Sequence, residues 1–143
     1  MALSVKSVMT KKINTVDRDA TIVDAAKVMA ADTSHEGYVI ILEKGTPVGI
    51  ITERDIVNKV VVRERNPAQM TVAEIMSSPL ITIDPDEDML TATQMMREHD
   101  VRKLVVVRDT IIYGVITARD VAQHASDYVN RVTKDLIRWT SLR

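Results

Sequence analysis

An internal repeat is the sequence feature that most constrains the fold of this chain. Residues 5–10 align with residues 72–77 at an offset of 67 residues, and the same offset aligns residues 15–19 with residues 82–86. Further along, residues 49–55 align with residues 114–120 at an offset of 65 residues. Such a repeat makes each copy one supersecondary unit that buries a hydrophobic face against its neighbour. The sequence therefore predicts two similar units, residues 1–67 and residues 68–143.

The change of offset means that the second copy is two residues shorter than the first. We expect one residue to be missing from the segment between Ala31 and Gly37 of the first copy, and the other from the hairpin that contains residues 43–46. Loops are where such differences in length are tolerated.

Each copy shows the same order of hydrophobic patterns. A short extended segment, 14–16 or 81–83, precedes a helix over 21–31 or 88–99, in which apolar residues recur at helical spacing. Two aliphatic runs, 38–42 with 48–52 and 104–107 with 113–117, predict a β-hairpin, and a second helix begins at Thr52 or Thr117. The sequence thus predicts an α/β protein of the α+β type, with two β-α-β-β-α repeats. A unit of about 65 residues has a small core, so we expect each sheet to be covered by its twin.

Composition excludes several classes of function. The 143 residues include 45% hydrophobic and 27% charged residues, which is typical of one compact domain or a close pair of small ones. The net charge of −1 argues against a protein that coats nucleic acid or an anionic membrane. There is no cysteine, and hence no disulfide or thiolate metal site, and the three histidines are too scattered to predict a zinc site. No apolar run is long enough to span a membrane and no signal sequence is recognised, so we expect a cytoplasmic protein.

A single motif, glycine, two aliphatics, threonine, any residue, arginine and aspartate, is nearly identical in the two copies. One interpretation is structural: a threonine at a helix start and an aspartate three residues later form a capping box. The other is a nucleotide site, because a helix N-terminus, a hydroxyl and an arginine attract phosphate, and a carboxylate accepts hydrogen bonds from ribose. The residues concerned are Thr52, Arg54, Asp55, Thr117, Arg119 and Asp120.

These motifs resemble those of the CBS-domain family, in the tandem arrangement called a Bateman module. The resemblance extends over nearly the whole chain. It implies two repeats packed sheet to sheet about a pseudo-twofold axis, with two clefts that bind adenosine ligands: AMP first, then ADP or ATP, or S-adenosylmethionine. It also implies a sensor or regulatory module that has no catalysis of its own, forms a homodimer and signals to an unknown downstream protein.

The resemblance also implies a role for each residue of the site. The two aspartates would hold the ribose hydroxyls, and the two threonines of the motif, with their helix N-termini, would hold phosphate. Thr15 and Thr82 would offer backbone groups to the adenine edge, while Tyr38, Val39, Leu104 and Val105 would form walls around the base. Before its central strand the second copy carries Arg102 and Lys103, where the first has His35, Glu36 and Gly37. Because Glu36 repels phosphate, we expect the second half to provide the better phosphate site.

The C-terminal segment 120–143 predicts one long helix with an apolar face. Such a face is normally buried, either on the helix's own module or across a dimer partner as an isologous contact. Two other hypotheses remain beside the sensor: a dimeric interaction scaffold that binds no ligand, and a nucleic-acid adaptor that uses the basic side of this helix. The apolar residues are Val121, Ala125, Tyr128, Val132, Leu136 and Trp139, and the basic ones are Arg131, Lys134 and Arg138.

Overall fold

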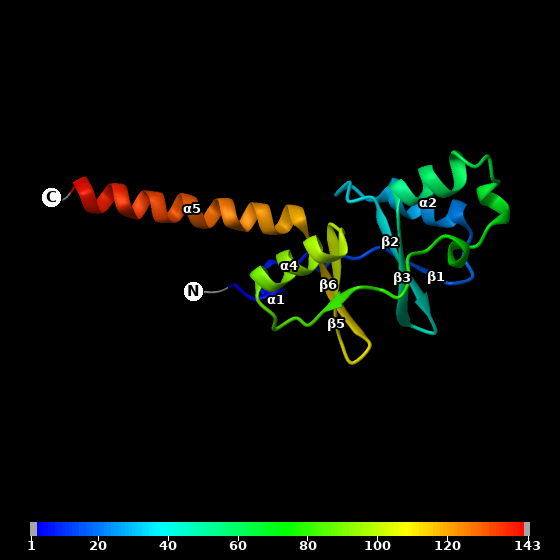
Figure 1. Ribbon diagram of the computed structural model, residues 1–143, viewed down its shortest axis with the longest axis horizontal. Helices are drawn as coiled ribbons and strands as arrows, with labels where there is room; N and C mark the ends of the chain where they lie inside the picture. Colours follow the sequence, from blue (N-terminus) through cyan, green and yellow to red (C-terminus); the bar gives the residue numbers. More distant parts are fainter. Residues whose placement is uncertain (1–2, 142–143) are drawn as a thin grey trace. The chain divides into compact units, whose positions relative to one another are not determined.

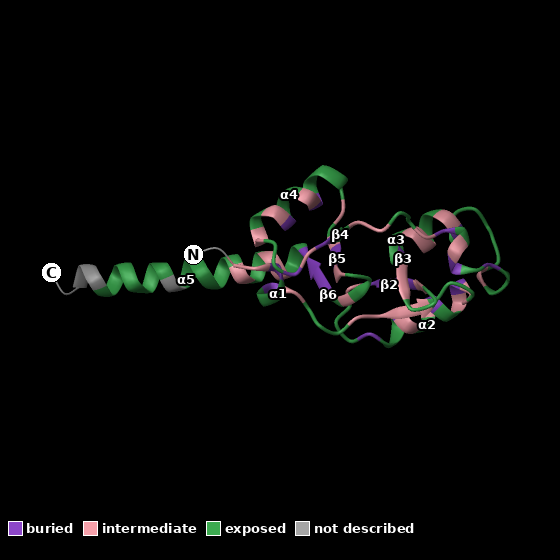
Figure 2. Ribbon diagram, turned by 90° about the horizontal axis from the view of Figure 1, so that it is seen from below, coloured by how far each residue is buried: buried purple, intermediate pink, exposed green. Residues whose placement is uncertain are grey.

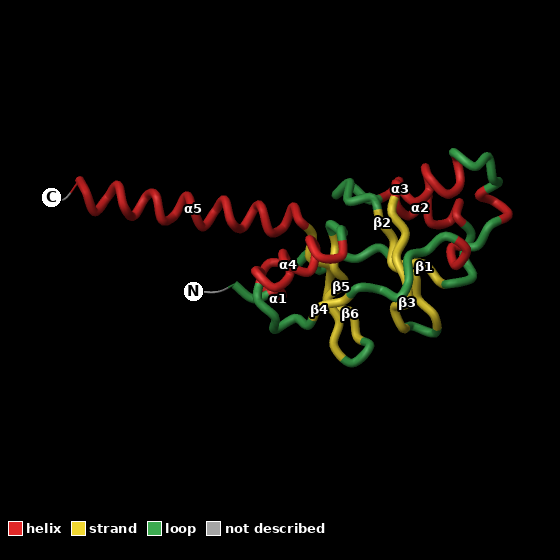
Figure 3. Tube along the Cα trace, in the orientation of Figure 1, coloured by secondary structure: helices red, strands yellow, loops and turns green. Residues whose placement is uncertain are grey.

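The computed structural model describes residues 3–141, apart from the side chains of residues 131 and 139–141. It is a mixed α/β structure with two three-stranded sheets, in the orders β1-β2-β3 and β4-β5-β6 (Figures 1 and 3). The predicted fold class is therefore confirmed. Its elements are α1 (Val5–Val8), β1 (Thr15–Asp17), α2 (Ile22–Ala31), β2 (Tyr38–Glu43), β3 (Thr46–Thr52), α3 (Glu53–Ile56), the π-helix η1 (Val57–Val61), the 3₁₀ turns η2 (Pro67–Gln69) and η3 (Val72–Glu74), β4 (Thr82–Ile83), α4 (Met89–His99), β5 (Lys103–Arg108), β6 (Ile111–Thr117) and α5 (Ala118–Ser141).

The chain divides into two compact units. The first-sheet unit comprises Lys12–Thr82 with Arg108–Ile112, and the second-sheet unit comprises the residues up to Lys11, Ile83–Val107 and the residues from Tyr113 onward. The segment that leads into the first repeat thus belongs to the unit built on the second sheet. The boundary between the sequence repeats at residues 67 and 68 stays a prediction.

In the first-sheet unit, β1 pairs in parallel with β2, and β2 pairs antiparallel with β3. Helix α2 connects the two parallel strands, and its N-terminus is closed by a capping box between Thr21 and Asp24. Its buried residues Ile22, Ala25 and Met29 recur at helical spacing, as the sequence predicts.

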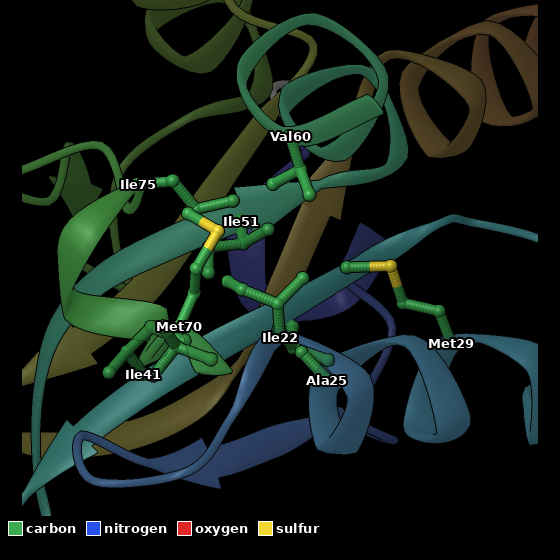
Figure 4. Packing of buried hydrophobic residues seen from close by; sticks show 10 residues of the cluster. Ile22, Ala25, Met29, Ile41, Ile51, Val60, Met70 and Ile75 are labelled. Carbon is green, nitrogen blue, oxygen red and sulfur yellow. The ribbon is translucent and has the colours of Figure 1, made fainter. Parts of the chain in front are cut away.

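The core of this unit lies between α2 and one face of the sheet. Figure 4 shows Ile22, Ala25 and Met29 of α2 together with side chains of β2, β3 and the segments that follow. The cluster consists of aliphatic residues and two methionines, consistent with a chain that has no phenylalanine. Its members are Ile22, Ala25, Met29, Val39, Ile41, Ile51, Val60, Met70, Val72 and Ile75.

The two hairpins have the same length, so one prediction is wrong. Both have a two-residue turn with positive φ at each position: Lys44 and Gly45 at 50° and 81°, Asp109 and Thr110 at 52° and 69°. Each turn joins strands of six and seven residues. This equality places both missing residues in the loop before the central strand, rather than one in the hairpin. The reason is physical: a two-residue hairpin turn cannot lose a residue without shifting the strand register.

The leading segment of each repeat pairs with the last strand of the other repeat's sheet. Thr10 exchanges two backbone hydrogen bonds with Val115 of β6, at 2.8 and 2.9 Å. Ser77 exchanges two with Ile50 of β3, at 2.9 and 3.2 Å. The two pairs occupy equivalent positions in the two repeats. In each pair the leading segment passes close to the glycine of the motif, Gly114 or Gly49. A Cβ on Gly114 would lie 2.5 Å from the carbonyl oxygen of Thr10.

This close approach predicts that Gly114→Ala destabilises the protein. The new methyl group meets backbone that is itself hydrogen-bonded, so we expect a loss of about 1–3 kcal/mol in the free energy of unfolding, measured by chemical denaturation. Gly49→Ala is the matched control, because its Cβ first meets the flexible Met76 side chain at 2.6 Å. We expect the smaller loss there. Equal stability of Gly114→Ala and the wild type would contradict the packing described.

Candidate ligand-binding site

The predicted site residues of the first half gather at one end of the first sheet. Thr15 begins β1 and Tyr38 begins β2, while Thr52 ends β3. Since β1 and β2 are parallel and β3 is antiparallel to them, these three ends meet at the same edge. Tyr38 is directly opposite Thr52, and Thr15 is opposite Ile40.

The strand alternation divides these residues between the two faces of the sheet. Val39 and Ile51 belong to the core cluster on the α2 side. Neighbouring residues in a strand point to opposite faces, so Tyr38 and Thr52 lie on the other face. The Val39 side chain lies on the α2 side with the core cluster. The predicted contact of Val39 with the base stays a prediction.

Both copies of the motif form the predicted capping box. In the first, the Thr52 amide donates to the Asp55 carboxylate at 2.9 Å, and the Asp55 amide donates to the Thr52 hydroxyl at 3.3 Å. In the second, the corresponding distances between Thr117 and Asp120 are 3.0 and 3.0 Å. The structural interpretation of the motif is therefore confirmed. The ligand-binding interpretation stays a prediction, and the capping box leaves room for it because a carboxylate accepts about four hydrogen bonds.

The two aspartates have different additional partners. Lys59 lies 3.3 Å from Asp55 Oδ1, and its ammonium also donates to the Ile75 carbonyl at 3.0 Å. At Asp120 the additional donor is the Thr10 hydroxyl, 3.1 and 3.2 Å from the two carboxylate oxygens. The position equivalent to Lys59 is His124, whose ring Nδ1 lies 2.9 Å from the Asp120 carbonyl oxygen. The first carboxylate is thus ion-paired, whereas the second is bonded to a neutral hydroxyl.

The residue before each central strand is tied to the start of the following helix. The Glu53 amide donates to the Gly37 carbonyl at 3.0 Å, and the Ala118 amide donates to the Arg102 carbonyl at 2.9 Å. Arg102 therefore adjoins the N-terminus of α5. Lys103 is the first residue of β5, as Tyr38 is of β2, so by the equal lengths of the hairpins we expect Lys103 to lie beside Thr117, as Tyr38 lies beside Thr52. The sequence analysis treated Leu104 instead of Lys103 as the equivalent of Tyr38, because it placed one of the missing residues in the hairpin.

The remaining predicted site residues lie in α3, α5, β4 and β5. Arg54 and Arg119 are exposed in the first turns of α3 and α5, and Thr82 is exposed at the start of β4. Leu104 and Val105 are fully buried in β5. Their contacts with a ligand stay predictions.

The buried carboxylate of Asp32, which the sequence analysis did not predict as a functional group, holds the segment that precedes β1. Asp32 is 7% exposed. It accepts hydrogen bonds from the Asn14 amide at 2.7 Å, from the Ser34 backbone at 2.9 Å and from the Ser34 hydroxyl at 2.8 Å. Asn14 immediately precedes Thr15, so this cluster fixes the residue that leads into the site. The hydrogen bonds from Ser34, and then that from Asn14, lower the pKa of Asp32.

Between residues 3 and 141 no three His, Cys, Asp or Glu side chains gather as a metal site would require. No helix among the same residues has the length and apolar character needed to cross a membrane.

A comparison with protein families shows to which family this chain belongs. The model of the CBS domain matches it twice, over residues 5–62 and 72–127. The chain belongs to the CBS-domain family. It carries tandem CBS domains, a regulatory module, and the two matched segments coincide with the repeat found in the sequence.

Individual relatives agree with this assignment. The chain is 32% identical to the CBS domain-containing protein YhcV of Bacillus subtilis, over 83% of each chain. It is 41% identical to an uncharacterized protein of Methanopyrus kandleri over 59% of this chain, which is only 44% of that protein. Among solved structures, it is similar to the hexameric CBS-CP12 protein from bloom-forming cyanobacteria. That similarity has a TM-score of 0.77 and 28% identity, and covers 85% of this chain and 67% of the other.

The lowered pKa of Asp32 predicts a pH-dependent contribution to stability. A carboxylate whose pKa is lower in the folded state stabilises the fold above its unfolded pKa, and this contribution disappears as the pH falls through the folded value. We expect Asp32→Asn to lower the free energy of unfolding by about 1–3 kcal/mol at pH 7. The difference from the wild type should shrink below pH 3.8, the ordinary value.

Denaturation of both proteins between pH 7 and pH 2.5 measures this effect. The exposed Asp109 in the β5–β6 turn, at which no such network is described, provides the matched control Asp109→Asn. A difference between Asp32→Asn and the wild type that stayed constant over the whole pH range would mean that the ionised carboxylate is not the source of the stabilisation.

Proposed function

We propose that this CBS pair is a regulatory module that binds an adenosine nucleotide at the end of the second sheet and responds with a change of shape. AMP is the first candidate, followed by ADP and ATP. The observation that carries the proposal is the gathering of complementary groups at the β6–α5 junction. Thr117 and Asp120 lie there, the backbone of Arg102 is bonded to the first turn of α5, and Lys103 begins the adjacent strand.

Asp120 is suited to hold the ribose. Its carboxylate accepts the Thr10 hydroxyl through both oxygens, at 3.1 and 3.2 Å. A ribose hydroxyl is a donor of the same kind, so it can replace Thr10 in a nearly even exchange of hydrogen bonds. The capping bonds from the Thr117 amide need not break in that exchange.

Phosphate would be held by the basic residues of the same junction. Arg102, Lys103 and Arg119 add three positive charges near the start of a 24-residue helix. The dipole of a long helix favours an anion at its N-terminus, and guanidinium groups bind phosphate oxygens in pairs. In the first half the corresponding helix is shorter, since α3 and the π-helix η1 that continues it cover nine residues, and Glu36 stands before the central strand. We therefore propose that the second half binds the nucleotide more tightly.

A ligand regulates only if it binds two conformers with different affinity. Thr10 can link ligand binding to a change of conformation. Its hydroxyl bonds to Asp120, and its backbone pairs with Val115. Replacement of the hydroxyl by ribose would alter how the leading segment is held on the second-sheet unit. We propose that this segment carries the response.

Self-association is the second part of the proposal. The cyanobacterial relative is hexameric, and long exposed apolar faces are typical of interacting proteins. The same observation favours the alternative function of an interaction scaffold whose site binds no ligand. S-adenosylmethionine and nucleic acid remain the other ligands to test.

Calorimetric titration with AMP, ATP, S-adenosylmethionine and adenosine tests the nucleotide site. We expect AMP to bind, and Asp120→Ala to weaken it by about 10-fold to 100-fold, the effect of losing hydrogen bonds to a charged group. Asp55→Ala is the matched control, since it removes the same capping box from the other repeat. A double variant, Arg102→Ala with Lys103→Ala, should weaken AMP more than adenosine.

Three results would contradict the proposal. Absence of binding by every adenosine compound would favour the scaffold. A larger effect of Asp55→Ala than of Asp120→Ala would move the site to the first half. Equal loss of AMP and adenosine in the double variant would remove the phosphate role of the basic pair. Thermal unfolding of each variant separates loss of affinity from loss of fold.

A further inference from the structure

The C-terminal helix α5 carries an apolar face beyond the elements of its own unit. The first turns of α5 lie beside α1 and α4, and the helix then continues past them (Figure 1). From Ala125 onward every described side chain of α5 is exposed (Figure 2). Tyr128 is 50% exposed, Val132 40% and Leu136 58%. Of the sequence predictions for this helix, Trp139 and Arg131 lie outside the described side chains.

These exposed residues share one face. Ala125, Tyr128, Val132 and Leu136 are spaced by three or four residues, so they form a continuous stripe, which we call the α5 stripe. Packing of such a stripe supplies most of the stability of a helix, because a short isolated helix is marginal in water. The stripe therefore needs a covering surface that its own unit does not provide among the described residues.

We infer that the α5 stripe is covered by the same stripe of a second copy, with the two helices antiparallel. This inference deepens the proposed self-association and rests on it. It is independent of the nucleotide site.

The stripe is complementary to itself in that orientation. With a twofold axis near residue 130, Ala125 of one copy faces Leu136 of the other, and Tyr128 faces Val132. Each layer then combines a smaller side chain with a larger one, which is how facing helices fill the space between them. A twofold axis also closes the assembly, because the same surface is used by both copies.

The polar residues that flank the stripe agree with this orientation. His124 and Asp135 lie along the same edge of the stripe, by the helical spacing of eleven residues. In an antiparallel pair this edge meets its own copy, so His124 of one copy lies opposite Asp135 of the other. The other edge carries Ser126 and Thr133, which are uncharged. Among the side chains that the structure describes, no like charges are therefore brought together along either edge.

The polar side of α5 argues against nucleic acid as the partner. Asp127 lies there with Lys134 and Arg138, so both signs of charge are mixed. A nucleic-acid surface would be expected to carry one sign.

Light scattering of the full chain over a micromolar range tests the inference. We expect the wild type to be oligomeric. In the double variant Val132→Glu with Leu136→Glu, two buried carboxylates per copy would face apolar groups, so we expect the measured molar mass to fall to half of the wild-type value or less. Asn130→Glu and Lys134→Glu together change the charge of the helix without touching the stripe, and should keep the wild-type mass. A double stripe variant with unchanged mass would overturn the inference and leave self-association through another surface. A monomeric wild type would overturn both.

Disulfide cross-linking tests the orientation, since the chain has no cysteine of its own. Ala125→Cys mixed with Leu136→Cys should form a mixed disulfide after subunit exchange. Ala125→Cys alone should not cross-link, because an antiparallel pair separates the two cysteines by about 16 Å along the helix axis. Cross-linking of Ala125→Cys alone, without the mixed product, would indicate parallel helices and overturn the proposed arrangement. Absence of every cross-link in an oligomer would mean that another surface covers the stripe.

Discussion

The structure depends on two short backbone pairings, between Thr10 and Val115 and between Ser77 and Ile50. Each adds the leading segment of one repeat to the sheet of the other, and a glycine lies at each crossing, with the closer approach to backbone at Gly114. The constraint explains why the motif begins with glycine in both copies. It also ties the leading segment to the strand that ends at the candidate site, so the fold and the site share the same residues.

The secondary structure was predictable because it follows from local periodicity. Apolar residues at helical spacing fixed α2 to within one residue of its observed start, and the aliphatic runs located both hairpins. The exchange of leading segments was not predictable in this way, because pairing between residues 10 and 115 leaves no local pattern. The hairpin length was misassigned for a related reason. Alignment of aliphatic residues alone does not reveal register, which depends on the turn.

The motif residues of the site were also found in the sequence, because the repeat marks them twice. Three partners were missed: Asp32, Lys59 and, as a partner of Asp120, Thr10. Asp32 and Ser34 form an Asx-type turn with a weak local signal, and Lys59 lies four residues after Asp55. The contact of Thr10 with Asp120 spans 110 residues and needs the three-dimensional fold. Local spacing could have suggested the first two, but not the third.

The difference between the two aspartates follows from what a ligand must displace. At Asp55 a ribose hydroxyl would compete with the Lys59 ammonium, in an ion pair whose carboxylate side chain is only 19% exposed. A neutral donor replaces a cation poorly there, because partial burial strengthens the attraction between the charges. At Asp120 the same ribose would replace a threonine hydroxyl, so the exchange conserves both the charge and the kind of hydrogen bond. Nearly identical motifs can therefore differ in affinity through one residue outside the motif, and that residue is supplied by η1 in one half and by the leading segment in the other.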